Sequence, residues 1–61
     1  MNSILGQFEA RTAAELQLAL DQTKWLNDCV ARGLMKPEHA RGYLQVEQNI
    51  IATKRFVLGL S

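Results

Sequence analysis

The sequence predicts an all-α protein, an antiparallel hairpin of two helices that dimerises into a four-helix bundle. Apolar residues recur at helical spacing on both sides of a single break in the chain. That break contains the only proline, which follows a glycine by four residues. The chain has 61 residues, and a chain of that length buries only about 60% of its unfolded surface when it folds alone. A second copy is therefore expected to supply the missing contacts.

The break between the helices runs from Ala31 to Glu38. Gly33 can take the left-handed conformation that ends a helix, and Pro37 suits the first position of a helix, where its missing N–H is not needed. A connection of about four residues makes the two helices antiparallel neighbours. We therefore predict one domain over residues 1–61, with a helix at about 3–32, a turn at 33–36 and a second helix at about 37–58.

The first helix has two candidate starts. Ser3 is a suitable N-cap ahead of a continuous apolar seam, whereas Thr12 opens a stretch with the form of a capping box. The seam favours the longer helix, since its spacing of three or four residues holds throughout: Leu5, Phe8, Thr12, Leu16, Ala19, Thr23, Leu26 and Val30. The longer helix overhangs the second by about two turns. Three residues then lack a partner inside the hairpin: Ile4, Leu5 and Phe8.

A second apolar row on the first helix projects away from this seam. It consists of Ala14, Leu18, Trp25 and Cys29 and lies roughly opposite the seam at about 100° per residue. A helix that is apolar on two faces must pack against two neighbours, of which the second helix is one. Tryptophan is a favoured anchor at protein interfaces. The alternative is that Trp25 is buried in the homodimer core. The predicted protein-binding residues are Ile4, Leu5, Phe8, Leu18, Trp25 and Cys29.

The second helix carries three apolar rows that repeat every seven residues. Two of them form a normal a/d seam: Tyr43, Ile50 and Val57, and Val46, Thr53 and Leu60. The third broadens the apolar arc beyond what one partner helix requires: Leu44, Ile51 and Leu58. Glu47 and Lys54 lie inside this arc and are expected to divide it into two contact surfaces. The predicted core of hairpin and dimer is Leu16, Leu26, Val30, Tyr43, Leu44, Val46, Ile50, Ile51, Val57 and Leu58.

Cysteine and histidine occur once each, as Cys29 and His39. One cysteine cannot form an intrachain disulfide, and the two residues are too few for a structural zinc, so we predict no metal and no cofactor. They are also the only candidate nucleophile and base. The alternative, which we favour, is a small buried thiol and an exposed imidazole. Asp21 and Asp28 are typical of a solvated helix face, and the sequence predicts that the protein is not an enzyme.

Seven Lys and Arg against six Asp and Glu give a net charge of +1, too balanced for a long-range field toward nucleic acid or a membrane. Arg32, Lys36 and Arg41 cluster near the turn and are the candidate phosphate contacts. A solvated cluster beside the helix ends is the simpler interpretation. The chain has no apolar run of about 20 residues and no signal-peptide pattern. We therefore expect a cytoplasmic protein without membrane contact.

Surplus apolar surface without catalytic groups favours a non-enzymatic protein-interaction module. We expect a dimeric helical regulator or inhibitor that binds another protein. Two alternatives remain: a small adaptor that binds RNA or DNA through the basic turn end, and a structural subunit that serves only oligomerisation. The nucleic-acid alternative predicts an affinity that falls steeply as salt rises.

Overall fold

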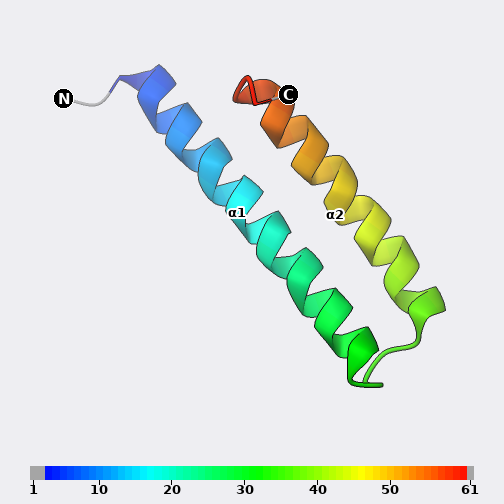
Figure 1. The fold of residues 1–61 in the computed structure, drawn as a ribbon. Coiled ribbons are helices and arrows are strands. Elements are labelled where there is room, and N and C mark those ends of the chain that lie inside the picture. The colour runs from blue at the N-terminus through cyan, green and yellow to red at the C-terminus, as the bar shows by residue number, and fades with distance from the viewer. Residues whose placement is uncertain (1–2, 61) are drawn as a thin grey trace.

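The computed structural model of the protein describes residues 3–60. Two α-helices lie side by side and antiparallel, α1 (Ile4–Ala31) and α2 (Pro37–Val57), and this range contains no strand (Figure 1). The predicted all-α hairpin is confirmed. The molecule measures 47 × 19 × 13 Å, and its shortest dimension is close to the diameter of one helix with side chains, ~10–12 Å. The hairpin is therefore a single layer of two helices with both faces open.

α1 begins at Ile4 because Ser3 caps it. The Ser3 hydroxyl accepts a hydrogen bond of 2.9 Å from the Gly6 N–H and satisfies one of the donors left free at a helix start. The alternative start at Thr12 is wrong, since Thr12 lies inside the helix. Thr12 is buried, and its hydroxyl donates to the Phe8 carbonyl at 2.8 Å. α1 therefore has 28 residues against 21 in α2.

Gly33 closes α1 with a left-handed φ of +73°. Its N–H donates to the Val30 carbonyl at 3.1 Å, and the Leu34 N–H donates to the Cys29 carbonyl at 2.9 Å. These two bonds define a Schellman motif, which satisfies carbonyls left free at a helix end. α2 then starts at Pro37, so the chain reverses direction within a few residues.

Each helix meets the other along one stripe of residues spaced three and four apart. On α1 the buried and half-buried positions of this stripe are Thr12, Leu16, Ala19, Thr23, Leu26 and Val30. On α2 they are Ala40, Leu44, Glu47, Ile51, Lys54 and Leu58. α2 thus faces α1 with the third apolar row of the sequence, while Tyr43 and Val46 of the a/d seam are exposed. Ala19 and Ala40 are only 3% and 1% exposed, and such small side chains let two helices approach closely.

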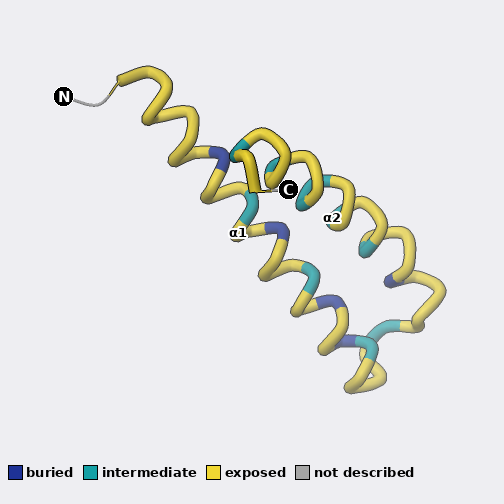
Figure 2. Tube along the Cα trace, turned by 45° about the horizontal axis from the view of Figure 1, so that its top comes forward, coloured by how far each residue is buried: buried dark blue, intermediate teal, exposed yellow. Residues whose placement is uncertain are grey.

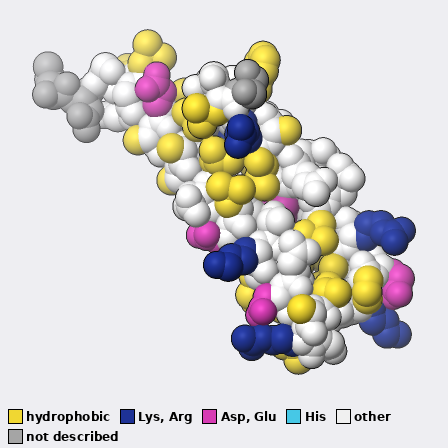
Figure 3. All heavy atoms as spheres, in the orientation of Figure 1, with side chains coloured by type: hydrophobic (Ala, Val, Ile, Leu, Met, Phe, Trp, Pro, Cys, Tyr) yellow, Lys and Arg dark blue, Asp and Glu magenta, His cyan; other side chains and the backbone are white. Residues whose placement is uncertain are grey.

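Little of the molecule is buried. Among residues 3–60 the buried positions are Thr12, Ala19, Leu26, Cys29 and Ala40, and Figure 2 shows that the first turns of α1 extend past the end of α2 with all residues exposed. Figure 3 shows hydrophobic side chains at the surface along the line where the helices meet. A compact monomer of 6.9 kDa exposes roughly 4000 Å², whereas this hairpin exposes 5041 Å². The excess is about 1000 Å².

Candidate functional site

Large apolar side chains cover much of the surface of the hairpin. The exposed ones in the described part of the chain are Ile4, Leu5, Phe8, Leu18, Leu20, Trp25, Leu34, Tyr43, Val46, Phe56, Val57 and Leu60. Single exposed apolar residues are normal in any protein, but a contiguous group marks an interaction surface. Half of these side chains lie on one face of the hairpin, because they fall on the same side of the contact stripe on each helix.

Most of the exposed apolar residues of α2 follow a heptad seam. Its positions are Tyr43, Val46, Ile50, Thr53 and Val57, and Leu60 continues it past the end of the helix; only Ile50 is half-buried. This seam lies about 100° around the helix from the stripe that faces α1. In a four-helix bundle each helix contacts two neighbours on two such adjacent sides. One of these two sides of α2 is occupied in the hairpin, and the other is open.

Leu18 and Trp25 of α1 lie on the same face of the hairpin as this seam. The opposite face carries a shallow groove, lined among others by Asn27 of α1 and by Arg41 and Gln48 of α2. On each helix the groove residues lie on one side of the contact stripe, and Leu18, Trp25 and the heptad seam lie on the other side. We term this surface the seam face; its apolar members are Leu18, Trp25, Tyr43, Val46, Ile50, Val57 and Leu60.

The prediction that Cys29 shares an exposed row with Leu18 and Trp25 is wrong, and the favoured interpretation of Cys29 as a small buried thiol is confirmed. Leu18 is 60% and Trp25 56% exposed, but Cys29 is only 7% exposed. The reason is the chain reversal at Gly33, after which the turn returns against this end of α1 and the Leu34 N–H bonds the Cys29 carbonyl. A buried thiol is a small apolar core residue. Cys29 is therefore neither an exposed anchor nor an accessible nucleophile.

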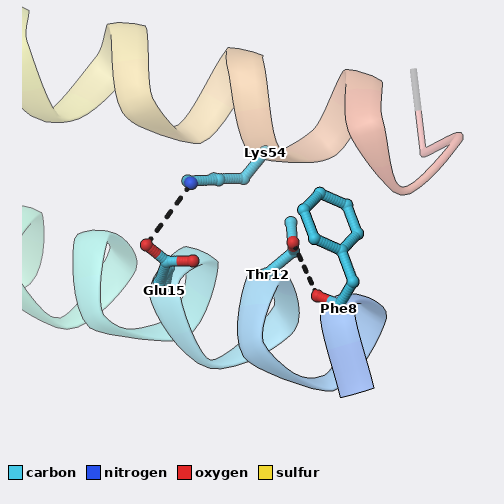
Figure 4. A network of polar contacts seen from close by, with 4 residues as sticks. All are labelled: Phe8, Thr12, Glu15 and Lys54. Atoms are coloured by element: carbon cyan, nitrogen blue, oxygen red, sulfur yellow. Dashed lines mark hydrogen bonds and ion pairs between the residues drawn. The ribbon is translucent and has the colours of Figure 1, made fainter. Parts of the chain in front are cut away.

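Ile4, Leu5 and Phe8 form the part of α1 that projects beyond α2, which we term the overhang. All three side chains are exposed. Figure 4 shows Phe8, Thr12 and Glu15 projecting from α1 toward α2, with the Phe8 ring near the end of the second helix. Ile4 and Leu5 thus project beyond α2, as the longer helix predicts, whereas the Phe8 ring reaches the end of α2 and is less exposed than they are.

A hollow beside the turn was not foreseen from the sequence. It is lined by Leu34, Met35, Lys36, His39 and Tyr43. Tyr43 also belongs to the seam face, so the hollow continues that face to the turn end of the hairpin. The path of the turn decides which side chains line this hollow, and local sequence patterns do not specify that path.

Two polar residues on the seam side of α1 were also missed. Arg11 precedes Leu18 and Trp25 by seven and fourteen residues, and this heptad spacing would have found it. Glu15 pairs with Lys54 of α2 at 3.4 Å. No local signal marks Glu15, because its partner lies on the other helix.

The basic residues near the turn do not form one patch. The Nε of Arg32 lies 3.1 Å from the Asp28 carboxylate, which offsets its charge locally. Arg41 lines the groove on the face opposite the seam face, and Lys36 lines the turn hollow beside His39. This separation disfavours a shared phosphate contact, which needs the cations to converge on one backbone.

The described residues include neither a cluster of metal ligands nor a helix that could span a membrane. Over 3–60, no three His, Cys, Asp or Glu side chains lie close enough to hold a metal ion. Neither α1 nor α2 combines the length and the apolar character that crossing a bilayer requires.

Comparisons with protein-family models, with curated proteins and with solved structures give no match to this chain. Its function is therefore inferred from its own surface.

Proposed function

We propose that this protein is a non-enzymatic protein-interaction module, a small dimeric helical regulator that binds another protein and modulates it. The observation that supports this proposal is the exposed apolar seam face. Removing apolar surface from water is favourable by about 25 cal/mol per Å² before the entropic cost of association is subtracted. A phosphate backbone offers charge but no comparable apolar surface. Another protein is therefore the partner that fits this face.

The form of the seam face suggests how binding modulates the partner. Two antiparallel helices present parallel apolar rows, which accept the apolar side of an amphipathic helix. A protein that docks such a helix here loses access to that side of the helix for its own assembly. Trp25 and Leu18 are the expected anchors on α1, because large side chains near the centre of an interface dominate binding energy.

Affinity capture with matched variants tests the proposal. The wild-type protein and two variants, Trp25→Ala and Leu20→Ala, serve as bait in lysate of the source cells, and the captured proteins are identified by mass spectrometry. Leu20 is an exposed apolar residue of α1 outside the seam face. We expect the wild type and Leu20→Ala to capture the same protein in near-stoichiometric amount, and Trp25→Ala to capture much less.

Two other outcomes would contradict the regulator role. Capture of nothing but further copies of the chain would favour a structural oligomerisation subunit. Capture of nucleic acid, with recovery that falls steeply as salt rises, would favour the adaptor role.

A further inference from the structure

We propose that a second copy of this chain covers the seam face, and that the two hairpins pack face to face with their turns at opposite ends. The inference rests on the proposed function, which makes this face a binding surface. A second copy and a partner helix compete for it, so the dimer is the form of the protein without its partner. It specifies a four-helix bundle in which α1 packs on α1 and α2 packs on α2.

The surface area of the hairpin agrees with a dimer of standard size. A stable interface covers about 800 Å² on each partner, which is roughly one sixth of the 5041 Å² that the hairpin exposes. The excess over a compact monomer, about 1000 Å², has the same size. One further copy is therefore enough to bring the exposed surface per chain down to that of an ordinary small domain.

The level of the dimer axis follows from the register of the two helices. The ion pair between Glu15 and Lys54 puts these residues at the same height along the hairpin, and the helix ends at the turn, Ala31 and Pro37, agree with this register to within one residue. The helical part of the α2 seam runs from Tyr43 to Val57 and has its midpoint at Ile50, which then lies level with Ala19 of α1.

The midpoint of α1, which spans Ile4–Ala31, falls between residues 17 and 18, about 2 Å from that level along the helix axis. A two-fold axis that crosses the helices at right angles here pairs α1 with α1 over its whole length and the α2 seam with the α2 seam over most of its length. Such an axis makes the contact self-complementary, as a symmetric dimer requires. The agreement of the two midpoints to within two residues supports a second copy as the occupant.

The same axis gives the overhang a partner. Phe8 lies about ten residues from the axis on the side away from the turn. In the second copy, the same distance on the turn side reaches the level of Asn27 on α1, directly opposite, and of Tyr43 on α2, diagonally across the bundle. The turn hollow lined by Met35, His39 and Tyr43 of one copy thus lies opposite the overhang of the other.

Arg11 and Trp25 also meet across this axis. Trp25 lies between seven and eight residues from the axis toward the turn, which is level with Ala10 and Arg11 of the second copy. An arginine over an indole face gains a cation–π interaction. This contact accounts for an arginine in the heptad row of Leu18 and Trp25.

The other symmetric arrangement, with both turns at the same end, fits less well. Its axis runs parallel to the helices and packs α1 of one copy on α2 of the other. Because α1 is seven residues longer than α2, both overhangs then project past both copies of α2 and stay exposed. The geometry therefore points to turns at opposite ends.

Cysteine cross-linking tests this arrangement. In a Cys29→Ser background, Leu18→Cys places a thiol next to the axis, where it meets its own symmetry mate. Leu20→Cys in the same background is the matched control, since Leu20 lies on α1 outside the seam face. Under mild oxidation we expect Leu18→Cys to form covalent dimers at least about tenfold faster than Leu20→Cys, because a disulfide needs Cα atoms within ~7 Å. Equal rates would overturn the arrangement.

A second variant tests the orientation of the two copies. In the Cys29→Ser background, Arg11→Cys with Trp25→Cys should give a disulfide between chains, detected by mass spectrometry on mixed isotope-labelled and unlabelled protein. Within one chain these positions are about 21 Å apart along the helix. A link within one chain, or none in a protein of dimeric mass, would contradict turns at opposite ends.

Sedimentation of the wild-type protein separates this inference from the proposed function. At micromolar concentration we expect twice the chain mass of 6.9 kDa. A monomer would overturn the inference, while the capture experiment would still decide whether another protein is bound. A dimer locked by the Leu18→Cys disulfide should capture little of the partner protein, because its seam faces are covered. Wild-type protein of dimeric mass that captures no other protein at any concentration would support the inference and contradict the regulator role.

Discussion

Lys54 of α2 reaches across the hairpin to Glu15 of α1, with 3.4 Å between its Nζ and the Glu15 Oε2 (Figure 4). Lys54 lies in the contact stripe between two apolar residues, Ile51 and Leu58. The Lys54 side chain is 27% exposed and that of Glu15 47%, so water screens the pair. The pair therefore specifies the register of the helices more than it stabilises them.

A double-mutant cycle measures this contribution. Glu15→Gln and Lys54→Met, alone and together, should show a coupling free energy of about 0.2–1 kcal/mol that shrinks as salt rises. Urea unfolding at one protein concentration provides the values. Glu9→Gln with Lys54→Met is the control and should show no coupling. A coupling of several kcal/mol would mean that the pair is buried in solution.

Two glycines should respond to alanine with opposite signs. Gly33→Ala should destabilise the protein by about 1 kcal/mol, because Gly33 has a φ of +73° that alanine adopts only with strain. Gly42→Ala should stabilise it by about 0.5–1 kcal/mol, because Gly42 lies inside α2 and an added Cβ meets nothing within 4 Å. Thermal unfolding of both variants checks the prediction, and a shared sign would contradict it.

Close approach of the helices depends on Ala40. Ala40→Leu should cost about 1–3 kcal/mol, since Ala40 is buried against α1 and a larger side chain forces the helices apart. Ala52→Leu is the control, because Ala52 is an exposed residue of the same helix and its replacement should change stability by less than about 0.5 kcal/mol. Urea unfolding distinguishes them. Equal effects would show that the contact stripe is misplaced.

Thr12 should act through its methyl group more than through its hydroxyl. The hydroxyl donates to the Phe8 carbonyl at 2.8 Å, but the bond lies within one helix. Thr12→Val keeps the shape and should change stability by less than about 1 kcal/mol. Thr12→Ser keeps the hydroxyl, removes the buried methyl and should cost about 0.8 kcal/mol. A serine variant more stable than the valine variant would reverse this assignment.

Self-association should depend on Ile50. Because a dimer is stabilised by mass action, the melting temperature of the wild-type protein should rise with protein concentration. Ile50→Asp places a charge in the α2 seam and should abolish this dependence. Phe56→Asp, at an exposed position of α2 outside the seam face, should retain it. Loss of the dependence in both variants would indicate general destabilisation instead of a specific interface.

Local signals in the sequence account for most of the secondary structure. Ser3 and Gly33 act through hydrogen bonds to residues within five positions in the chain, so caps and turns can be recognised without knowing the fold. The same holds for the apolar rows, since their spacing reflects the helix period. The end of α2 at Val57 agrees with the predicted end at about residue 58, and Gly59, with a φ of +74°, closes this helix as Gly33 closes α1.

The site was predicted less well. Leu18, Trp25 and the overhang are exposed as predicted, but Cys29 is buried because the chain reversal covers it. The sequence showed three apolar rows on the second helix and no sign of which one meets α1. Arg11 and the turn hollow were also missed, although Arg11 continues a heptad row that the sequence displays.

The sequence by itself determined that the chain forms two helices, where the reversal lies between them, and that the second helix has more apolar surface than one neighbour can cover. Only the tertiary structure decided that Leu44, Ile51 and Leu58 face α1 while Tyr43 and Val57 face outward. The physical reason is that periodicity sets which residues share a row, whereas the rotation of each helix about its own axis depends on how the two surfaces pack. In this rotation the buried alanines Ala19 and Ala40 lie in the contact between the helices and Lys54 pairs with Glu15. The same rotation leaves the α2 seam exposed.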